Sequence, residues 1–164
     1  MRNGIGIGTL VYSLAAMTIG AWARDDEKIA LEKLPAAVMK TIKGKFADAK
    51  IKSASSEVEH GKTIYEVELI RNGAEIDVAL SSTGTILEIE KEIKTADLPK
   101  AVSDALKTKY PNGMVKKVEE ITVGETKSYE VGVEFAVGKN IDVTFDPNGT
   151  ILEDEDDDTE PGDD

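Results

Sequence analysis

The residues of this chain that could carry chemistry are one histidine, a few serines and 32 aspartates and glutamates. His60 precedes Gly61 in a predicted hairpin turn, and a lone histidine beside a turn glycine usually belongs to the turn itself. No serine lies in a nucleophile elbow, and no phosphate-binding glycine loop is present. The absence of cysteine excludes a thiol nucleophile, a zinc–thiolate site and a disulfide framework. The sequence therefore predicts no catalytic residue, no metal-ligand set and no cofactor.

Many of the carboxylates alternate with apolar residues, as Glu66 and Glu68 do with Tyr65, Val67 and Leu69. This period of two is typical of antiparallel strands with one buried and one solvated side. We predict an acidic sheet face that consists of Glu66, Glu68, Glu75, Asp77, Glu88, Glu90, Glu130, Glu134 and Asp142. Water around these side chains is expected to keep their pKa values close together, which disfavours acid–base catalysis. A face that only keeps the sheet soluble is the alternative interpretation.

The predicted strands belong to a pattern that occurs twice. Each copy opens with a Leu-Pro step and a helix whose apolar residues recur every four positions, over 34–46 and 98–110. Each copy closes on Gly-Thr-Ile-Leu-Glu, at 84–88 and 149–153. In the first strand of each copy the alternation breaks, which indicates a β-bulge. We predict an α+β fold of two tandem α-β-β-β-β repeats, each with a helix packed on one face of an antiparallel sheet.

The two ends of the chain differ in composition from the repeats. Arg2, an apolar stretch and Ala21-Trp22-Ala23 have the order of a secretory signal, so we expect cleavage after Ala23. An uncleaved anchor is the alternative; with cleavage the protein is expected to be periplasmic or secreted and free of the membrane. The predicted segments are a signal peptide at 1–23, repeats at 24–92 and 93–154, and a disordered acidic tail at 155–164.

The charge of the chain is concentrated in its tail. The formal charge is −12, and nine of the last twelve residues are acidic. A nucleic-acid binder would show a basic stripe, which this sequence lacks. The tail is expected to act as a solubilising segment. Its carboxylates could also associate weakly with divalent cations, although they lack the spacing of an EF-hand loop.

The repeated motifs resemble the PepSY-like family, which is also described as resembling β-lactamase inhibitors. The resemblance covers 29–153 and rests on the Leu-Pro helix start and the aromatic residue at the helix end. It rests further on the Tyr-Glu-Val strands at 65–67 and 129–131 and on the strands that lead to a Gly turn. It implies a small, exported, non-catalytic α+β module that acts as an inhibitor or as a binding and regulatory domain. No inhibitory loop is recognisable, so no inhibitory residue is transferred.

These observations lead to a ranked set of functional hypotheses. The first is an exported, non-catalytic binding or regulatory module that engages a protein with a basic surface through the acidic sheet face. The second is an acidic envelope protein that associates with Ca²⁺. An inhibitor of a peptidase or another enzyme, and a hydrolase, are less favoured.

Overall fold

The computed structural model describes residues 27–136 and 138–156. The expected signal peptide, with its cleavage after Ala23, lies outside the described residues, as does the part of the expected tail beyond Asp156. The elements in chain order are β1 (Glu27–Lys28), the 3₁₀ helix η1 (Leu31–Lys33), α1 (Ala36–Lys45), β2 (Lys50–Glu59), β3 (Lys62–Arg71), β4 (Ala74–Ser81), β5 (Ile86–Glu92), η2 (Thr95–Asp97), α2 (Lys100–Lys109), β6 (Met114–Val123), β7 (Thr126–Glu134), β8 (Asn140–Phe145) and β9 (Ile151–Asp156).

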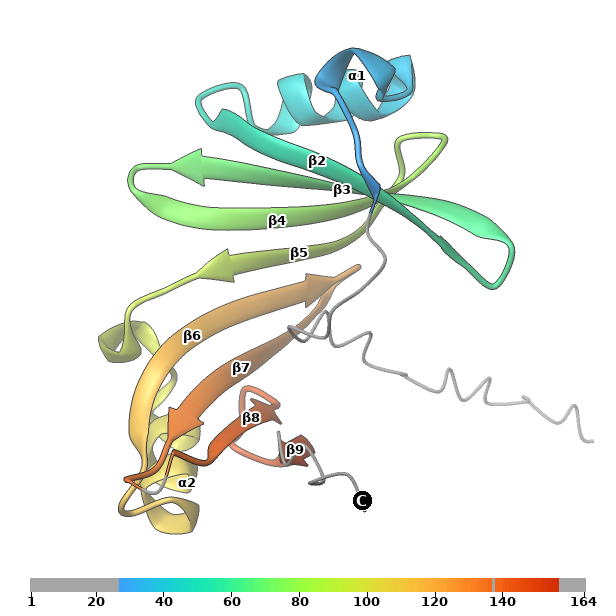
Figure 1. The fold of residues 1–164 in the computed structure, drawn as a ribbon. Coiled ribbons are helices and arrows are strands. Elements are labelled where there is room, and N and C mark those ends of the chain that lie inside the picture. The colour runs from blue at the N-terminus through green and yellow to red at the C-terminus, as the bar shows by residue number, and fades with distance from the viewer. Residues whose placement is uncertain (1–26, 137, 157–164) are drawn as a thin grey trace, which may run out of the picture.

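The nine strands form one sheet in which every strand pairs with its neighbours in the sequence. All pairings are antiparallel, so the predicted α+β class with an antiparallel sheet is confirmed. The strands β2–β5 and β6–β9 meet at a short seam, where β5 pairs with β6 from Ile89↔Thr122 to Glu92↔Glu119. Figure 1 shows the curved sheet, with α1 beside its first half and α2 beside its second.

Each α-helix begins directly after a Leu-Pro step. Pro35 and Pro99 are the N-caps of α1 and α2, and their carbonyls accept hydrogen bonds from the amides of Met39 and Ser103 at 3.1 and 3.0 Å. Proline suits this place because a helix start does not use its missing N–H group. Each helix has ten residues. Helices this short are marginal on their own, so packing against the sheet must hold them.

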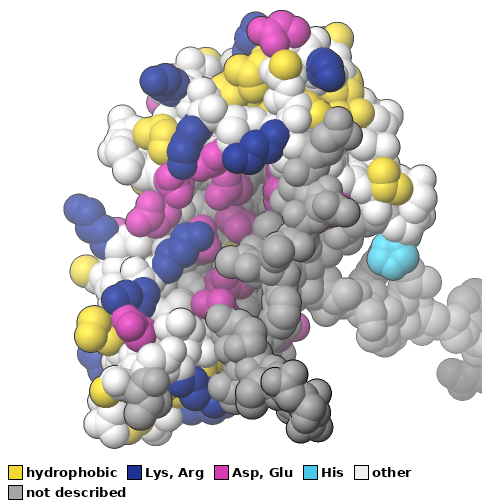
Figure 2. Space-filling view, in the orientation of Figure 1, with side chains coloured by type: hydrophobic (Ala, Val, Ile, Leu, Met, Phe, Trp, Pro, Cys, Tyr) yellow, Lys and Arg dark blue, Asp and Glu magenta, His cyan; other side chains and the backbone are white. Residues whose placement is uncertain are grey.

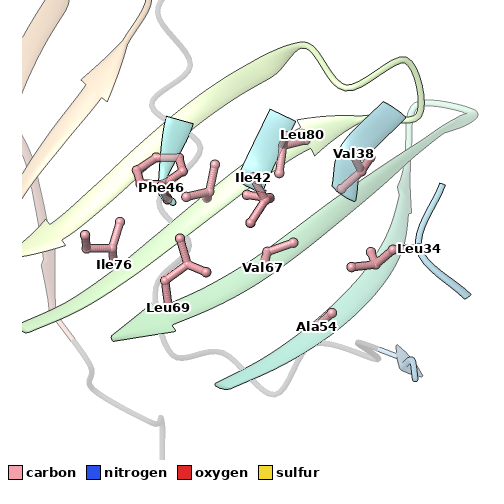
Figure 3. Packing of buried hydrophobic residues seen from close by; sticks show 10 residues of the cluster. Leu34, Val38, Ile42, Phe46, Ala54, Val67, Leu69, Ile76 and Leu80 are labelled. Atoms are coloured by element: carbon pink, nitrogen blue, oxygen red, sulfur yellow. The ribbon is translucent and has the colours of Figure 1, made fainter. Parts of the chain in front are cut away.

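Two separate apolar cores lie between the helices and the sheet, and Figure 3 shows the first of them. The first core comprises Leu34, Val38, Ile42, Phe46, Ala54, Val67, Leu69, Ile76, Val78 and Leu80. The second core comprises Leu98, Val102, Leu106, Val118, Tyr129, Val131, Val133, Val143 and Phe145. Tyr65 packs against the first core, as Tyr129 does within the second. The aromatic residue of each Tyr-Glu-Val strand therefore lies on the helix side of the sheet, as the alternation predicts.

Two glycine turns bring the sheet into contact with the helices. Gly84 and Gly149 adopt φ values of 79° and 84°, in the left-handed region that favours glycine. A Cβ atom at these positions would lie 2.6 Å from the Ala37 carbonyl oxygen and 2.5 Å from that of Ala101. The Thr41 hydroxyl donates a hydrogen bond of 2.8 Å to the Gly84 carbonyl. The repeated glycine is therefore required by a close approach of the turn to the helix.

The first strand of each half is bulged, as its broken alternation predicts. The register shifts between Ile51 and Ser53 where β2 pairs with β3. The equivalent shift lies between Val115 and Lys117 where β6 pairs with β7. Each bulge places an extra residue in the ladder and increases the local twist.

The last strand differs from the predicted boundary of the acidic tail. β9 continues to Asp156, which pairs with Ile141 of β8, so two residues assigned to a disordered tail belong to the sheet. Pairing with β8 satisfies backbone groups whatever the charge of the side chains, so composition alone misplaces this boundary. Over the described residues, neither helix is long and apolar enough to cross a membrane.

Candidate functional site

The side of the sheet opposite the two helices, here called the open face, carries the predicted carboxylates. The strand register places Glu68 of β3 opposite Asp77 of β4, and Asp77 opposite Glu90 of β5. Across the seam, Glu119 of β6 lies opposite Glu130 of β7. Because directly paired residues point to the same side of a sheet, these side chains form one acidic band that spans both halves. Figure 2 shows acidic side chains gathered on the molecule in this region, with lysines around them.

The centre of the open face is buried, although the sequence predicts solvated carboxylates throughout. Glu88, Glu90 and Glu119 expose only 7%, 8% and 5% of their surface. They lie on β5 and β6, the middle strands of the sheet, where side chains of the flanking strands enclose them. Alternation along one strand predicts the side of the sheet to which a residue points, but it does not predict how far the residue lies from the sheet edge. The expectation of a uniformly solvated face is therefore wrong at its centre.

Three carboxylates from adjacent strands converge at this centre. Asp77, Glu90 and Glu119 each offer an oxygen, and these oxygens all lie within 4.8 Å of one another. The Lys117 ammonium forms an ion pair with Glu119 at 2.9 Å and is half exposed. Glu119 was not among the predicted site residues, because its place depends on the seam register of β5 and β6. A separation of 29 residues between Glu90 and Glu119 leaves no local sequence signal for this contact.

Burial and mutual repulsion shift the pKa values of two of these groups upward. Burial, reinforced by the charges of Glu68 and Glu119, raises the pKa of Asp77 to about 6. Burial, a hydrogen bond with the Glu88 carboxyl and nearby negative charges raise the pKa of Glu90 far above its usual range. Water therefore does not hold these carboxyls at a common pKa, so uniform hydration does not disfavour acid–base chemistry in this cluster.

Towards the edges of the open face the carboxylates form ordinary ion pairs. The Lys52 ammonium contacts Glu68 and also lies 2.7 Å from a carboxylate oxygen of Glu75. Glu134, on β7, pairs with Lys116 at 2.5 Å. Asp142, on β8, is exposed and lies two strands away from the seam. The structure thus brings the residues of the first half together and leaves Glu134 and Asp142 at the periphery.

A cavity of about 260 Å³ opens on the acidic side of the first half. Its lining residues are Lys28, Ser53, Ala54, Ser55, Glu66, Glu68, Asp77, Glu90 and Lys117. The Ser53 hydroxyl donates a hydrogen bond of 2.5 Å to Glu68, and the Ser55 hydroxyl donates one of 3.3 Å to Glu66. Asp77 and Glu90 thus line the cavity together with two lysines, Lys28 and Lys117.

The donor set of the cluster suits hard cations and basic side chains. Carboxylate oxygens are the ligands that Ca²⁺ prefers, but three of them supply only part of the six to eight that it usually takes. His60 stands in the β2–β3 turn with a φ of 47°, which agrees with its predicted turn role. The arrangement can attract and neutralise positive charge.

Comparison with known proteins identifies the family to which the chain belongs. The PepSY-like family, described as beta-lactamase-inhibitor-like, matches twice, over residues 17–88 and 81–153. The chain belongs to this family, as its repeated motifs predict. No curated protein matches the sequence.

Solved structures support the same fold. A BLIP-like protein from Bacteroides fragilis is 26% identical with a TM-score of 0.60, and the match covers 78% of this chain and 88% of that one. A DUF2874 family protein from Bacteroides uniformis is 20% identical with a TM-score of 0.65, over 74% and 88% of the two chains. A protein from Bacteroides eggerthii, described as periplasmic, is 17% identical with a TM-score of 0.66, over 74% and 88%.

Proposed function

We propose that this protein is an exported, non-catalytic binding module that engages a protein partner with a basic surface through its open face. The observation that carries the proposal is the convergence of carboxylates from β3, β4, β5 and β6 on the side of the sheet that neither α1 nor α2 covers. Membership of a family described as beta-lactamase-inhibitor-like supports a binding function. The similarity to a periplasmic protein from Bacteroides eggerthii supports an exported location, periplasmic or secreted.

The open face combines two electrostatic environments that suit such a partner. The peripheral ion pairs are exposed and exchange readily, so they contribute little to affinity but allow long-range attraction. The central carboxyls are buried, and a lysine or arginine that enters the cavity beside Asp77 would meet them in a medium of low polarity. The edge therefore accelerates association, and the centre supplies the specific contact.

A strong enzyme inhibitor is a weaker candidate for the same face. Tight interfaces rely on buried tryptophan, tyrosine and arginine anchors. Tyr65 and Tyr129 pack on the helix side, and the large apolar residues exposed over the described part of the chain are Val58, Met114, Val123 and Leu152. This composition favours an electrostatically steered binder over an inhibitor.

The test is capture of the partner by baits that differ only on the open face. The variant Glu66→Gln/Asp77→Asn removes two carboxylates from the cavity lining. The matched control Glu32→Gln/Asp104→Asn removes two exposed carboxylates from η1 and α2. We expect the wild type and the control to recover the same partner from an envelope extract, and the open-face variant to lose it.

Salt provides a second readout for the same baits. Raising the ionic strength from about 0.1 M to about 1 M shortens the Debye length from about 10 Å to about 3 Å, which should release the partner. A partner that survives both the open-face variant and high salt, or that both variants lose equally, would refute binding through this face.

A second candidate function, association with calcium, is favoured by the convergence of Asp77, Glu90 and Glu119. Calorimetric titration of calcium into the full chain, into Glu119→Gln and into a chain truncated after Asp156 separates the possible sites. If Glu119→Gln loses the heat of calcium binding, the ion binds at the cluster. If the truncated chain loses it, the ion binds at the tail. Equal weak heat in all three proteins would contradict a specific calcium function.

A further inference from the structure

A groove of about 820 Å³ lies on the helix side of the sheet, where the two halves meet. The apolar cores are separate, and each helix covers only its own half. Ile89 packs against the first core and Ile93 packs against the second. Both residues line the groove, so the groove lies between the two cores. Its walls are the β3–β4 turn, the segment after β5 and the start of β6. Figure 1 shows that the β3–β4 turn and the segment after β5 lie at the same end of the sheet.

The floor of this groove is apolar. Phe46 at the C-cap of α1, Ile76 of β4 and Val118 of β6 line it together with the partly buried Ile89 and Ile93. Figure 3 shows Phe46 and Ile76 at one end of the first core. The size falls within the range of about 300–1,000 Å³ that is usual for small-molecule sites, which are mostly apolar with a few polar groups.

Basic residues outnumber acidic ones in the lining of the groove, although the chain as a whole carries −12. The lining includes five basic residues and two acidic ones, Glu92 and Asp97. Three of the basic residues form ion pairs: Arg71 with Asp48 at 2.9 Å, Lys116 with Glu134 and Lys117 with Glu119. Lys91 and Lys94 are exposed and form no ion pair among the described residues. These two ammonium groups are the positive charges that the groove leaves available to a ligand.

The two free lysines are placed to complete an amphipathic site. Lys91 pairs with Ile76 in the β4–β5 ladder, so its side chain leaves the sheet on the same side as that apolar residue. A lysine in this position can lay its methylene stem along an apolar floor and keep its ammonium group at the rim. Asp97, which also lines the groove, would repel a polyanion, which favours a ligand with a single negative group.

From this complementarity we propose that the groove binds a small amphipathic anion, a molecule with an extended aliphatic body and one carboxylate head. The aliphatic body replaces water over Phe46, Ile89 and Ile93, and the carboxylate contacts Lys91 and Lys94. The apolar floor of the groove lies on the opposite side of the sheet from the open face, and Lys117 is the residue that lines both the groove and the acidic cavity.

The test uses dodecanoate as the probe and the full-length chain as the receptor. Isothermal titration is expected to show one saturable site for dodecanoate, with much weaker heat for dodecyltrimethylammonium, which has the same chain and the opposite charge. The variant Lys91→Gln/Lys94→Gln should weaken binding about fivefold, the scale expected for two exposed charge contacts. The matched control Lys40→Gln/Lys43→Gln, on exposed positions of α1, should bind as the wild type does.

A second variant tests the apolar part of the site without altering charge. Ala74 begins β4 and lines the groove, so Ala74→Phe should fill it and abolish binding while the melting temperature changes little. Three results would overturn the proposal: no binding of dodecanoate up to about 1 mM, equal binding of the cationic amphiphile, or equal loss in the two lysine pairs. Retention of full affinity by a folded Ala74→Phe protein would also overturn it.

Discussion

Replacement of Asp77 by asparagine tests whether the centre of the open face is as poorly hydrated as its burial indicates. Asp77 lies between Glu68 on β3 and Glu90 on β5, and burial raises its pKa from an ordinary 3.8 to about 6. Asparagine has nearly the same shape and cannot ionise. The substitution therefore removes the cost of charging this site and leaves the packing in place.

The sign of the effect follows from proton linkage. Between about pH 4 and pH 6 the folded protein holds the Asp77 proton and the unfolded chain does not, so the stability that it contributes is lost as pH rises through this window. The rise in the pKa of Asp77 from 3.8 to about 6 corresponds to a loss of about 3 kcal/mol in the free energy of unfolding at pH 7. Solvent screening of this partly exposed carboxyl reduces that loss to about 1–2 kcal/mol. The variant should be more stable than the wild type by this amount at pH 7, and about equal to it below pH 4.

Thermal unfolding of both proteins between pH 3 and pH 8 measures this difference. The Asp77→Asn protein should melt about 3–8 °C above the wild type at pH 7, and the gap should close as the pH falls. Glu125→Gln, at an exposed carboxylate in the β6–β7 turn, is the control, and its free energy of unfolding at pH 7 should lie within about 0.5 kcal/mol of the wild type. A variant that is destabilised at pH 7, or a gap that stays constant down to pH 3, would refute the assignment of Asp77 to a desolvated acidic cluster.

Two further pairs of substitutions and one truncation test the packing and the boundary of the fold. Tyr129→Ala should lower the free energy of unfolding by about 3 kcal/mol in a denaturant titration, because the side chain fills the second core, whereas Glu134→Gln should cost less than about 1 kcal/mol. Gly149→Ala should cost about 1–3 kcal/mol more than Gly124→Ala, since both have positive φ but only the first would place its Cβ against a helix carbonyl. Truncation after Asp156 should leave the melting temperature unchanged within about 2 °C in calorimetry, because the removed residues are too polar to support a core; a larger drop would show that they are part of the fold.

Several features of this fold can be predicted from the sequence because they depend on local periodicity. The alternation around Tyr65-Glu66-Val67 reports two opposite environments on one strand, and the structure places Tyr65 against the first core. The Leu-Pro steps mark the helix starts, since proline tolerates the first turn and few places beyond it. The bulges near Ile51 and Val115 are visible for the same reason, because an extra residue breaks a period of two.

The acidic face itself is predictable as a set of residues, but its chemistry is not. Glu66 and Glu68 have the sequence environment of Glu88 and Glu90, with glutamates alternating among apolar neighbours. In the sheet, β3 lies nearer one edge and β5 lies at the centre. The position of a strand within the sheet therefore decides which glutamates are hydrated. That position cannot be predicted from the sequence of a single strand.

The amino-acid sequence by itself determined the helices, the strands and the side of the sheet on which each carboxylate lies, because all of these follow from spacing within ten residues or so. It also determined the repeat, because the same motifs occur twice in the same order. Only the tertiary structure decided which carboxylates meet. The β5–β6 seam brings Glu119 to Asp77 and Glu90, and the groove with Lys91 and Lys94 lies at the same seam. Both sites arise where two separately packed halves share one sheet. A contact between residues far apart in the sequence depends on the register of the paired strands, not on either strand alone.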